Sequence, residues 1–258
     1  MTTEIQTLKQ KTLTVRDLLL NNKDQIQAAL PRHMTVDRMI RVAFTSINLT
    51  PKLLDCSPRS LLAAVMQAAQ LGLEPGILGM VYLVPFKEQV QLIIGYKGLL
   101  RLARNSREIS TIFAQTVYAK DLFHYQFGTD PKIVHEPAAG DRGAPIYYYA
   151  VCRLKDGGVQ FEVMSHREIE EHRNRYSRAA KQGPWVTEFD EMAKKTVLRR
   201  LCKVLPASIE LQTAVALDER AEVQLPQDLP DVLNEPEPAS EKPSLDTLAQ
   251  PAGQGTLA

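Results

Sequence analysis

Apolar residues recur at helical spacing through the first third of the chain. The spacing predicts helices over residues 14–30, which a proline ends, and over residues 35–48, where Thr35 is placed to cap the N-terminus. A third helix begins after Ser57, an N-cap followed by a first-turn proline, and ends near a glycine. Its buried stripe consists of Leu61, Leu62, Val65, Met66 and Ala69.

The pattern then changes to runs of β-branched and apolar residues. Residues 80–86 and 90–94 are two such runs, and the three polar residues between them predict a hairpin. Residues 146–154 and 159–164 flank an Asp-Gly turn, which suits a backbone of positive φ. The middle of the chain is therefore expected to form antiparallel hairpins.

Helices resume after the second hairpin. Ser165 and Glu168 form a predicted capping box that opens a helix to about residue 180. Thr187 and Asp190 repeat the arrangement at the start of a longer helix over residues 187–205. The order of helices, strands, strands and helices predicts an α+β fold with antiparallel sheet, in which N-terminal helices precede hairpins packed with helices.

Composition adds little until charge is divided along the chain. The 258 residues carry 44% hydrophobic and 24% charged residues and a formal net charge of +1. Residues 218–258 hold nine acids and two bases, whereas residues 1–217 hold 29 bases and 21 acids, a net charge of +8. The segment 221–258 has six prolines and no aromatic residue, which predicts a disordered acidic tail on a basic folded body.

Several classes of protein are not supported. No run of about 18 apolar residues predicts a membrane span, and the N-terminus lacks the pattern of a secretory signal, so the cytoplasm is the expected location. The three cysteines are far apart and suggest neither a disulfide scaffold nor a thiolate zinc site. Phosphate-binding loops and the common hydrolase motifs are missing from the sequence, so no cofactor and no catalytic residue is predicted.

The most informative feature is a row of bases on the helix predicted over residues 187–205. At 100° per residue, Lys195, Arg199 and Lys203 form an i, i+4, i+8 row opposite an apolar arc, with Lys194 and Arg200 at its edges. Like charges in a row repel one another, so something anionic is expected to lie across them.

A second stripe and a third cluster of bases repeat this pattern. Lys97, Arg101 and Arg104 share one side of a helix that begins after Gly95, next to N–H groups that attract phosphate. The third cluster consists of Arg173, Arg175, Arg178 and Lys181 and precedes Trp185. Trp185 and Tyr96 are candidates for stacking on bases, although core packing explains them equally well, and each stripe alone fits a solvated helix face. Together with the basic body, the clusters favour a groove for nucleic acid.

Long motifs resemble the RecT family of phage and prophage recombinases. The matching stretches are Leu71-Gly72-Leu73-Glu74-Pro75-Gly76, Tyr82-Leu83-Val84-Pro85-Phe86, Val90-Gln91-Leu92-Ile93-Ile94-Gly95-Tyr96-Lys97-Gly98, residues 153–164, Gly183-Pro184-Trp185-Val186-Thr187 and Glu191-Met192-Ala193-Lys194-Lys195-Thr196. Leu30-Pro31-Arg32-His33-Met34-Thr35 is similar to the N-terminal helical part of the family. The similarity covers about residues 26–220.

The resemblance implies a protein that binds single-stranded DNA and anneals complementary strands in homologous recombination without ATP and without breaking bonds. It implies assembly of copies into rings or filaments, and a 5′ to 3′ exonuclease as partner. Lys97, Lys194 and Lys195 occupy basic positions of the family motifs and are expected to contact phosphates. The expected organisation is a helical region for subunit contacts at 1–50, an α+β annealing core at 51–220 and the tail at 221–258.

Two rival functions remain open. His172 with Glu168, Glu170 and Glu171 could form the metal site of a nuclease, although a charged, solvated helix face explains these residues as well. A protein that binds duplex DNA without sequence preference is the other.

Overall fold

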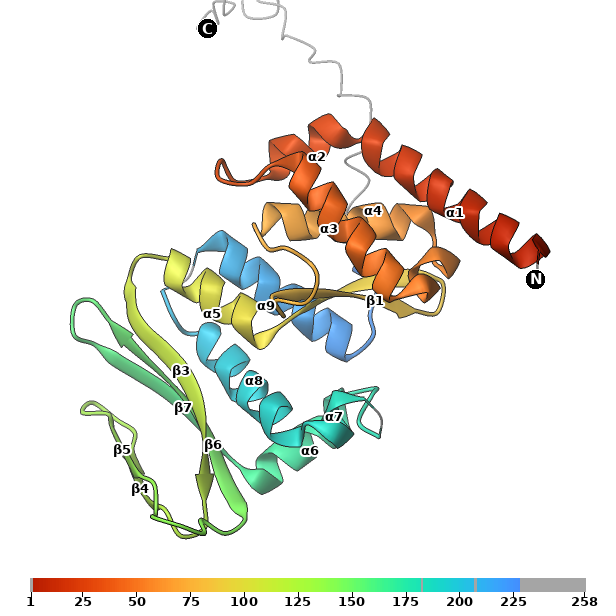
Figure 1. Ribbon diagram of the computed structural model, residues 1–258. Helices are drawn as coiled ribbons and strands as arrows, with labels where there is room; N and C mark the ends of the chain where they lie inside the picture. The colour runs from red at the N-terminus through yellow and green to blue at the C-terminus, as the bar shows by residue number, and fades with distance from the viewer. Residues whose placement is uncertain (1, 182, 207, 228–258) are drawn as a thin grey trace, which may run out of the picture. The chain divides into compact units, whose positions relative to one another are not determined.

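The computed structural model describes residues 2–181, 183–206 and 208–227. Its helices are α1 (Thr2–Asn21), α2 (Lys23–Ala29), α3 (Val36–Leu49), the 3₁₀ helix η1 (Pro51–Asp55), α4 (Pro58–Gln70), α5 (Tyr96–Asn105), α6 (His166–Tyr176), α7 (Pro184–Thr187), α8 (Phe189–Cys202) and α9 (Ile209–Glu222). Its strands are β1 (Val81–Phe86), β2 (Gln89–Ile94), β3 (Ile109–Tyr118), β4 (Leu122–Gln126), β5 (Lys132–Glu136), β6 (Pro145–Leu154) and β7 (Val159–Ser165). All strand pairs are antiparallel, and the predicted α+β class is confirmed (Figure 1).

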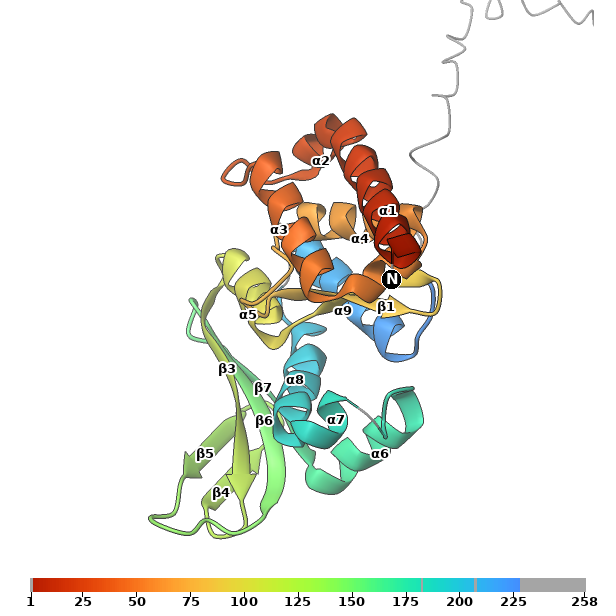
Figure 2. The ribbon, with the colours of Figure 1, turned by 45° about the vertical axis from the view of Figure 1, so that its right-hand side comes forward.

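The N-terminal helices form as their stop and start signals indicate. Thr35 and Ser57 hold the N-cap positions of α3 and α4, although neither side chain makes a capping hydrogen bond. Gly72 follows α4 with a φ of 63°, a conformation that glycine adopts at low cost. The helix predicted over residues 14–30 is instead two helices, α1 and α2. Helices α1, α2 and α3 all pack on α4, and α4 packs on β2 (Figure 2).

The first hairpin, β1–β2, has one edge that is completed by side chains rather than by another strand. The backbone N–H of Ile94 donates to Oδ1 of Asp218 at 3.1 Å. The amide of Gln227 pairs with both the N–H and the C=O of Leu92, at 2.7 and 2.9 Å. Because unpaired strand edges invite association, these contacts from α9 and the segment after it close the hairpin.

A second sheet has the strand order β3-β6-β7. Helix α8 packs against all three strands, on the face that holds Tyr148, Ala150 and Cys152 (Figure 1). The β4–β5 hairpin lies over the opposite face, where Phe123 stacks on Tyr149 with ring centroids 5.6 Å apart. Strands β3, β4 and β5 and helix α9 were not predicted from the pattern, whereas the β6–β7 hairpin was and is confirmed.

The two predicted caps of the later helices have different outcomes. Both hydrogen bonds of the capping box between Ser165 and Glu168 are present, and α6 ends at Tyr176, earlier than expected. The cap expected at Thr187 is wrong. Thr187 is the last residue of α7, and Asp190 instead accepts a hydrogen bond from the Tyr148 hydroxyl at 2.5 Å.

The described structure extends past the predicted start of the tail. Helix α9 runs to Glu222, and Gln227 is buried, so residues 221–227 belong to the folded body. The remainder of the predicted tail, 228–258, lies outside the described residues. Of the helices described, none is long and apolar enough to cross a membrane.

Candidate nucleic-acid interface

Helix α5 is held in place by two glycines that leave no room for side chains. A Cβ on Gly95 would lie 2.1 Å from the carbonyl oxygen of Gly79, and one on Gly98 would lie 2.2 Å from that of Met80. The N–H of Gly95 also donates to the Met80 oxygen at 2.8 Å. The loop before β1 therefore rests directly on the first turn of α5.

One face of α5 carries cations without carboxylate partners. Leu99, Leu102 and Ala103 are buried, as the helical spacing predicts. Lys97 and Arg104 are exposed on the other side, and within the described part of the chain neither forms an ion pair. We call Lys97, Arg101 and Arg104 the α5 basic surface.

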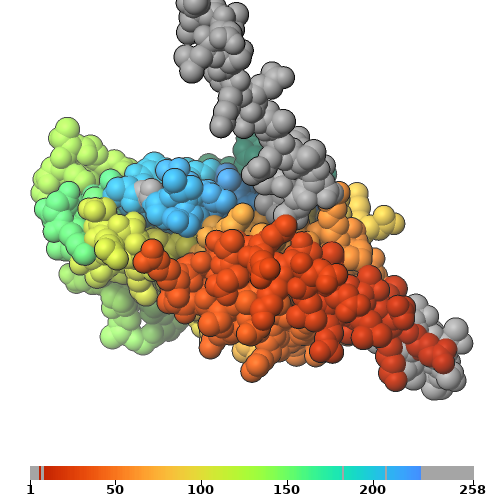
Figure 3. Space-filling view, turned by 90° about the horizontal axis from the view of Figure 1, so that it is seen from above, coloured from red at the N-terminus to blue at the C-terminus, as the bar shows by residue number. Residues whose placement is uncertain are grey.

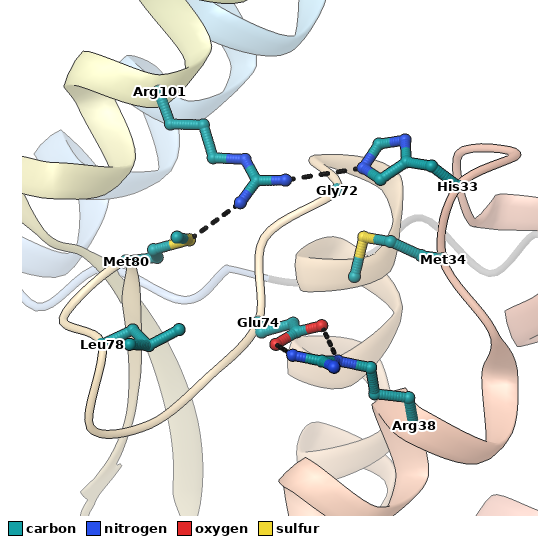
Figure 4. A pocket seen from close by; sticks show the side chains of 8 residues that line it. All are labelled: His33, Met34, Arg38, Gly72, Glu74, Leu78, Met80 and Arg101. Atoms are coloured by element: carbon teal, nitrogen blue, oxygen red, sulfur yellow. Dashed lines mark hydrogen bonds and ion pairs between the residues drawn. The ribbon is translucent and has the colours of Figure 1, made fainter.

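The guanidinium of Arg101 is held by weak partners only. Its nitrogens lie 3.6 Å from Sδ of Met80 and 3.5 Å from Nε2 of His33 (Figure 4). His33 belongs to the loop between α2 and α3, so this contact joins the N-terminal helices to α5. In the space-filling view, residues near 100 emerge beside the N-terminal helices (Figure 3). A positive charge with such neighbours is available to an external anion.

A polar pocket of about 240 Å³ lies beside Arg101. It is lined by His33, Met34, Arg38, Gly72, Glu74, Leu78, Met80 and Arg101. A two-pronged ion pair between Arg38 and Glu74 forms part of the wall, and the hydrogen bond from Arg38 lowers the pKa of Glu74, with a smaller effect of the Arg101 charge. The sequence did not single out His33 or Met80 as site residues, although both lie in or next to the quoted motifs.

The row of bases on α8 is paired with carboxylates of the protein itself. Nζ of Lys195 lies 2.7 Å from Oδ1 of Asp218, and Nη1 of Arg199 lies 2.8 Å from Oδ2 of the same carboxylate. Arg199 also pairs with Glu222, and its side chain is only 6% exposed. Lys195, Arg199, Asp218, Glu222 and His172 form what we call the α8–α9 network.

In this structure Lys195 and Arg199 therefore do not face an external anion, and the DNA contact expected of these two residues stays a prediction. The anions expected across the row are present, but they are carboxylates of α9. Lys203, at the end of the row, pairs with Glu219, which also lies on α9. The two edge residues are also paired, Lys194 with Glu191 and Arg200 with Glu162.

The carboxylate of Glu222 responds to these neighbours. Burial alone would raise its pKa, but the hydrogen bond from His172 and the charge of Arg199 outweigh burial and lower the pKa to about 2. His172 Nε2 lies 3.3 Å from Glu222 and 3.4 Å from the Arg199 guanidinium. A metal ion held by His172 would meet that positive charge. Among the described residues, no three His, Cys, Asp or Glu side chains come together to hold a metal.

The two aromatic candidates are engaged within the fold. Trp185 is 3% exposed and packs edge-on against Phe189 with ring centroids 5.7 Å apart, so core packing, one of the two roles left open for it, accounts for it in this structure. Tyr96 is half-buried, and its hydroxyl accepts a hydrogen bond from the N–H of Ala114 at 3.0 Å. Tyr96 thereby fixes the start of α5 beside β3.

The third basic cluster is partly engaged by aromatic rings. The guanidinium of Arg173 lies 5.4 Å from the ring centroid of Phe189, and that of Arg175 lies 5.3 Å from Tyr176. Arg178 is exposed, and only its backbone N–H has a recorded partner in the described structure. The cluster lies on and after α6 rather than on α5, so it is not part of the α5 basic surface.

Comparison with known proteins assigns these features to a family. The sequence model of the RecT family matches residues 37–231, a range that includes α5, the β1–β2 hairpin, α8 and α9. The chain belongs to the RecT family. It is 50% identical over 207 residues to Protein RecT of Escherichia coli, covering 77% of each chain. It is 28% identical over 206 residues to the uncharacterized protein YqaK of Bacillus subtilis, covering 77% of this chain and 69% of that one.

RecT-family proteins are single-strand annealing proteins, so the chain has a role in DNA recombination and binds DNA. The resemblance read from the motifs is confirmed.

Proposed function

We propose that this RecT-family protein anneals complementary DNA strands without ATP and holds one strand along the α5 basic surface. The observation that carries the proposal is the contrast between two helices. The cations of α5 form no ion pair in the described structure, whereas Lys195 and Arg199 on α8 are neutralised by α9. Phosphates are the anions that DNA offers to such unpaired cations.

The dimensions of the α5 basic surface fit a short piece of single strand. From Lys97 to Arg104 the helix rises about 10 Å, roughly the length of three nucleotides of one strand at the 3.4 Å rise of duplex geometry. Contacts to phosphates would leave the base edges free to pair with a second strand. Base pairing and stacking would then drive annealing, and the cations would reduce the repulsion between two polyanions.

Assembly and partners form the second part of the proposal. Copies of the chain along one strand would share DNA and subunit contacts, which would make binding cooperative. We assign the subunit contacts to residues 1–50 and expect a ring or a helical filament. A 5′ to 3′ exonuclease remains the expected partner, because annealing needs exposed single strands, and the cytoplasm remains the expected location.

The test is a pairing assay with two complementary oligonucleotides and no nucleotide cofactor. The protein should accelerate duplex formation, and electron micrographs of the product should show rings or filaments. Shortening of labelled strands in magnesium or manganese would instead indicate the rival nuclease. Tighter binding to a duplex than to a single strand, with no acceleration of pairing, would indicate the rival duplex binder.

A further inference from the structure

The α5 basic surface has an exposed aromatic neighbour that is not one of the two stacking candidates predicted from the sequence. Tyr82 on β1 is 46% exposed. It lies between the buried Val81 and Leu83, and strand alternation turns its ring to the opposite face of the hairpin. Neither Tyr96 nor Trp185 is similarly free, so an aromatic surface for a base must come from elsewhere.

The side chain of Tyr82 lies beside Lys97. The position that a Cβ on Gly79 would occupy is 2.9 Å from the Tyr82 hydroxyl oxygen and 4.0 Å from Cδ of Lys97. Both side chains therefore meet over Gly79, whose φ of 70° favours glycine. An exposed ring and an unpaired ammonium group from two different elements thus share one small area of the surface.

The support beneath this pair is rigid. Gly79 and Met80 contact Gly95 and Gly98 backbone to backbone, as described above, and the guanidinium of Arg101 rests on Sδ of Met80. The backbone segments that carry the ring and the two cations are consequently held together before any ligand arrives. Rings beside cations are the arrangement with which proteins bind single strands, since bases stack on the ring and phosphates pair with the cations.

We propose that Tyr82 stacks on a nucleobase of the strand whose phosphates Lys97 and Arg101 bind. This inference rests on the proposed function and adds a base-recognising residue to it. Stacking on a ring face does not depend on base identity or on the base edges, so this contact is compatible with a strand of any sequence that must still pair. The ligand class is a single-stranded polynucleotide with unpaired bases, rather than a polyanion of any kind.

The experiment measures equilibrium binding of the full chain to two fluorescent oligomers of equal length and charge. One is oligothymidine and the other is an abasic chain that has the sugars and phosphates alone. Tyr82→Ala should weaken binding to oligothymidine by roughly 5- to 150-fold, which is the range for loss of one stacked base. Its affinity for the abasic oligomer should equal that of the wild type, and the salt dependence of both should be unchanged.

Two further variants separate stacking from folding. Tyr82→Phe keeps the ring and should bind both oligomers within about twofold of the wild type. Tyr82→Leu keeps apolar bulk without a ring and should lose affinity for oligothymidine as Tyr82→Ala does, so it serves if the alanine variant does not fold. Thermal unfolding of each variant verifies the fold.

The inference is overturned if the leucine and alanine variants bind oligothymidine as tightly as the wild type. It is also overturned if they lose the same factor on the abasic oligomer, because Tyr82 would then act only by supporting Lys97. If the wild type neither binds oligothymidine nor accelerates pairing, the proposed function itself fails, which is a separate result.

Discussion

Arg199 on α8 and Asp218 on α9 form an ion pair at 2.8 Å in which the two side chains are 6% and 2% exposed. The pair joins two helices of which the sequence pattern predicted only one. It converts a row of bases that looked like a ligand site into a structural contact between α8, α9 and, through the N–H of Ile94, strand β2. The availability of a cation to DNA is thus decided by the element packed opposite it.

Removing one partner of this pair should destabilise the fold. Arg199→Ala leaves the buried Asp218 carboxylate with Lys195 and the Ile94 N–H as its partners, and loss of one member of a buried pair costs about 3–5 kcal/mol. Urea denaturation followed by circular dichroism measures the change. Lys203→Ala is the matched control, because the Lys203–Glu219 pair is half-exposed and should contribute about 0–1 kcal/mol. Equal effects of the two variants would contradict the assigned burial.

The α5 basic surface should determine how DNA binding responds to salt. Replacing Lys97, Arg101 and Arg104 together by alanine should weaken binding to single strands and reduce the slope of log affinity against log salt by about 0.7 per lost phosphate contact, roughly two in all. The fold should be retained, since within the described residues none of the three is ion-paired.

A matched control for that experiment removes a charge elsewhere. Lys132 on β5 pairs with Asp130 and is 63% exposed, so Lys132→Ala removes a lysine whose charge is already engaged. The slope of log affinity against log salt for Lys132→Ala should match that of the wild type. The slope for Lys97→Arg should match it as well. An unchanged slope in the triple variant would remove α5 from the interface.

Local signals predicted much of the fold because caps, turns and periodicity act over a few residues. The capping box at Ser165 and the Asp-Gly hairpin are examples, and both are present. Strand β3 was missed, because its alternation of exposed and buried positions from Phe113 to Thr116 is not visible as alternating hydropathy: the exposed Phe113 is apolar and the buried Thr116 is polar. The β4–β5 hairpin shows a similar alternation.

The site was harder to predict because it depends on contacts between distant residues. Helical geometry placed Lys97, Arg101 and Arg104 on one face correctly, and it also placed Lys195 and Arg199 on one face. What separates the two rows is Asp218, 23 residues after Lys195, and no periodicity of α8 indicates which element lies across from it. Only packing distinguishes a paired cation from an unpaired one.

The stability of the α8–α9 network should depend on acid pH through Glu222. The folded-state pKa of about 2 lies below the ordinary value of 4.5, so the stabilisation by this carboxylate is complete above about pH 4.5 and is lost as the pH falls toward 2. Glu222→Gln should therefore be less stable than the wild type at pH 7. The difference should shrink between pH 4.5 and 2, as measured by urea unfolding at a series of pH values. A difference that is constant with pH would exclude ionisation of Glu222 as its cause.

A glycine-to-alanine change in α5 should lower the stability of the fold, although the same change in most helices raises it. Alanine within a helix is ordinarily about 1 kcal/mol more stable than glycine. In Gly98→Ala the new methyl would meet the Met80 carbonyl oxygen at 2.2 Å, so the loop before β1 must shift, and we expect a loss of about 1–3 kcal/mol. Asn105→Ala, at the exposed end of the same helix, should change stability by less than about 0.5 kcal/mol. A thermal denaturation series compares the two variants, and a stabilised Gly98→Ala would contradict the backbone contact.

The end of the folded body should lie at Gln227 rather than at residue 221. The buried side-chain amide of Gln227 serves the N–H and C=O of Leu92 and the C=O of Leu217, and the backbone carbonyl of Gln227 accepts a hydrogen bond from the Gln67 side chain. Gln227→Ala would leave buried backbone groups of β2 without partners, at about 1–3 kcal/mol for each group. A chain ended after Asp228 should therefore unfold at the same urea concentration as the full chain, whereas one ended after Pro226 should unfold earlier. Gln224→Ala is the control, because no side-chain hydrogen bond of Gln224 is recorded in the described structure. If both truncated chains matched the full chain, the side chain of Gln227 would not be what closes the β2 edge.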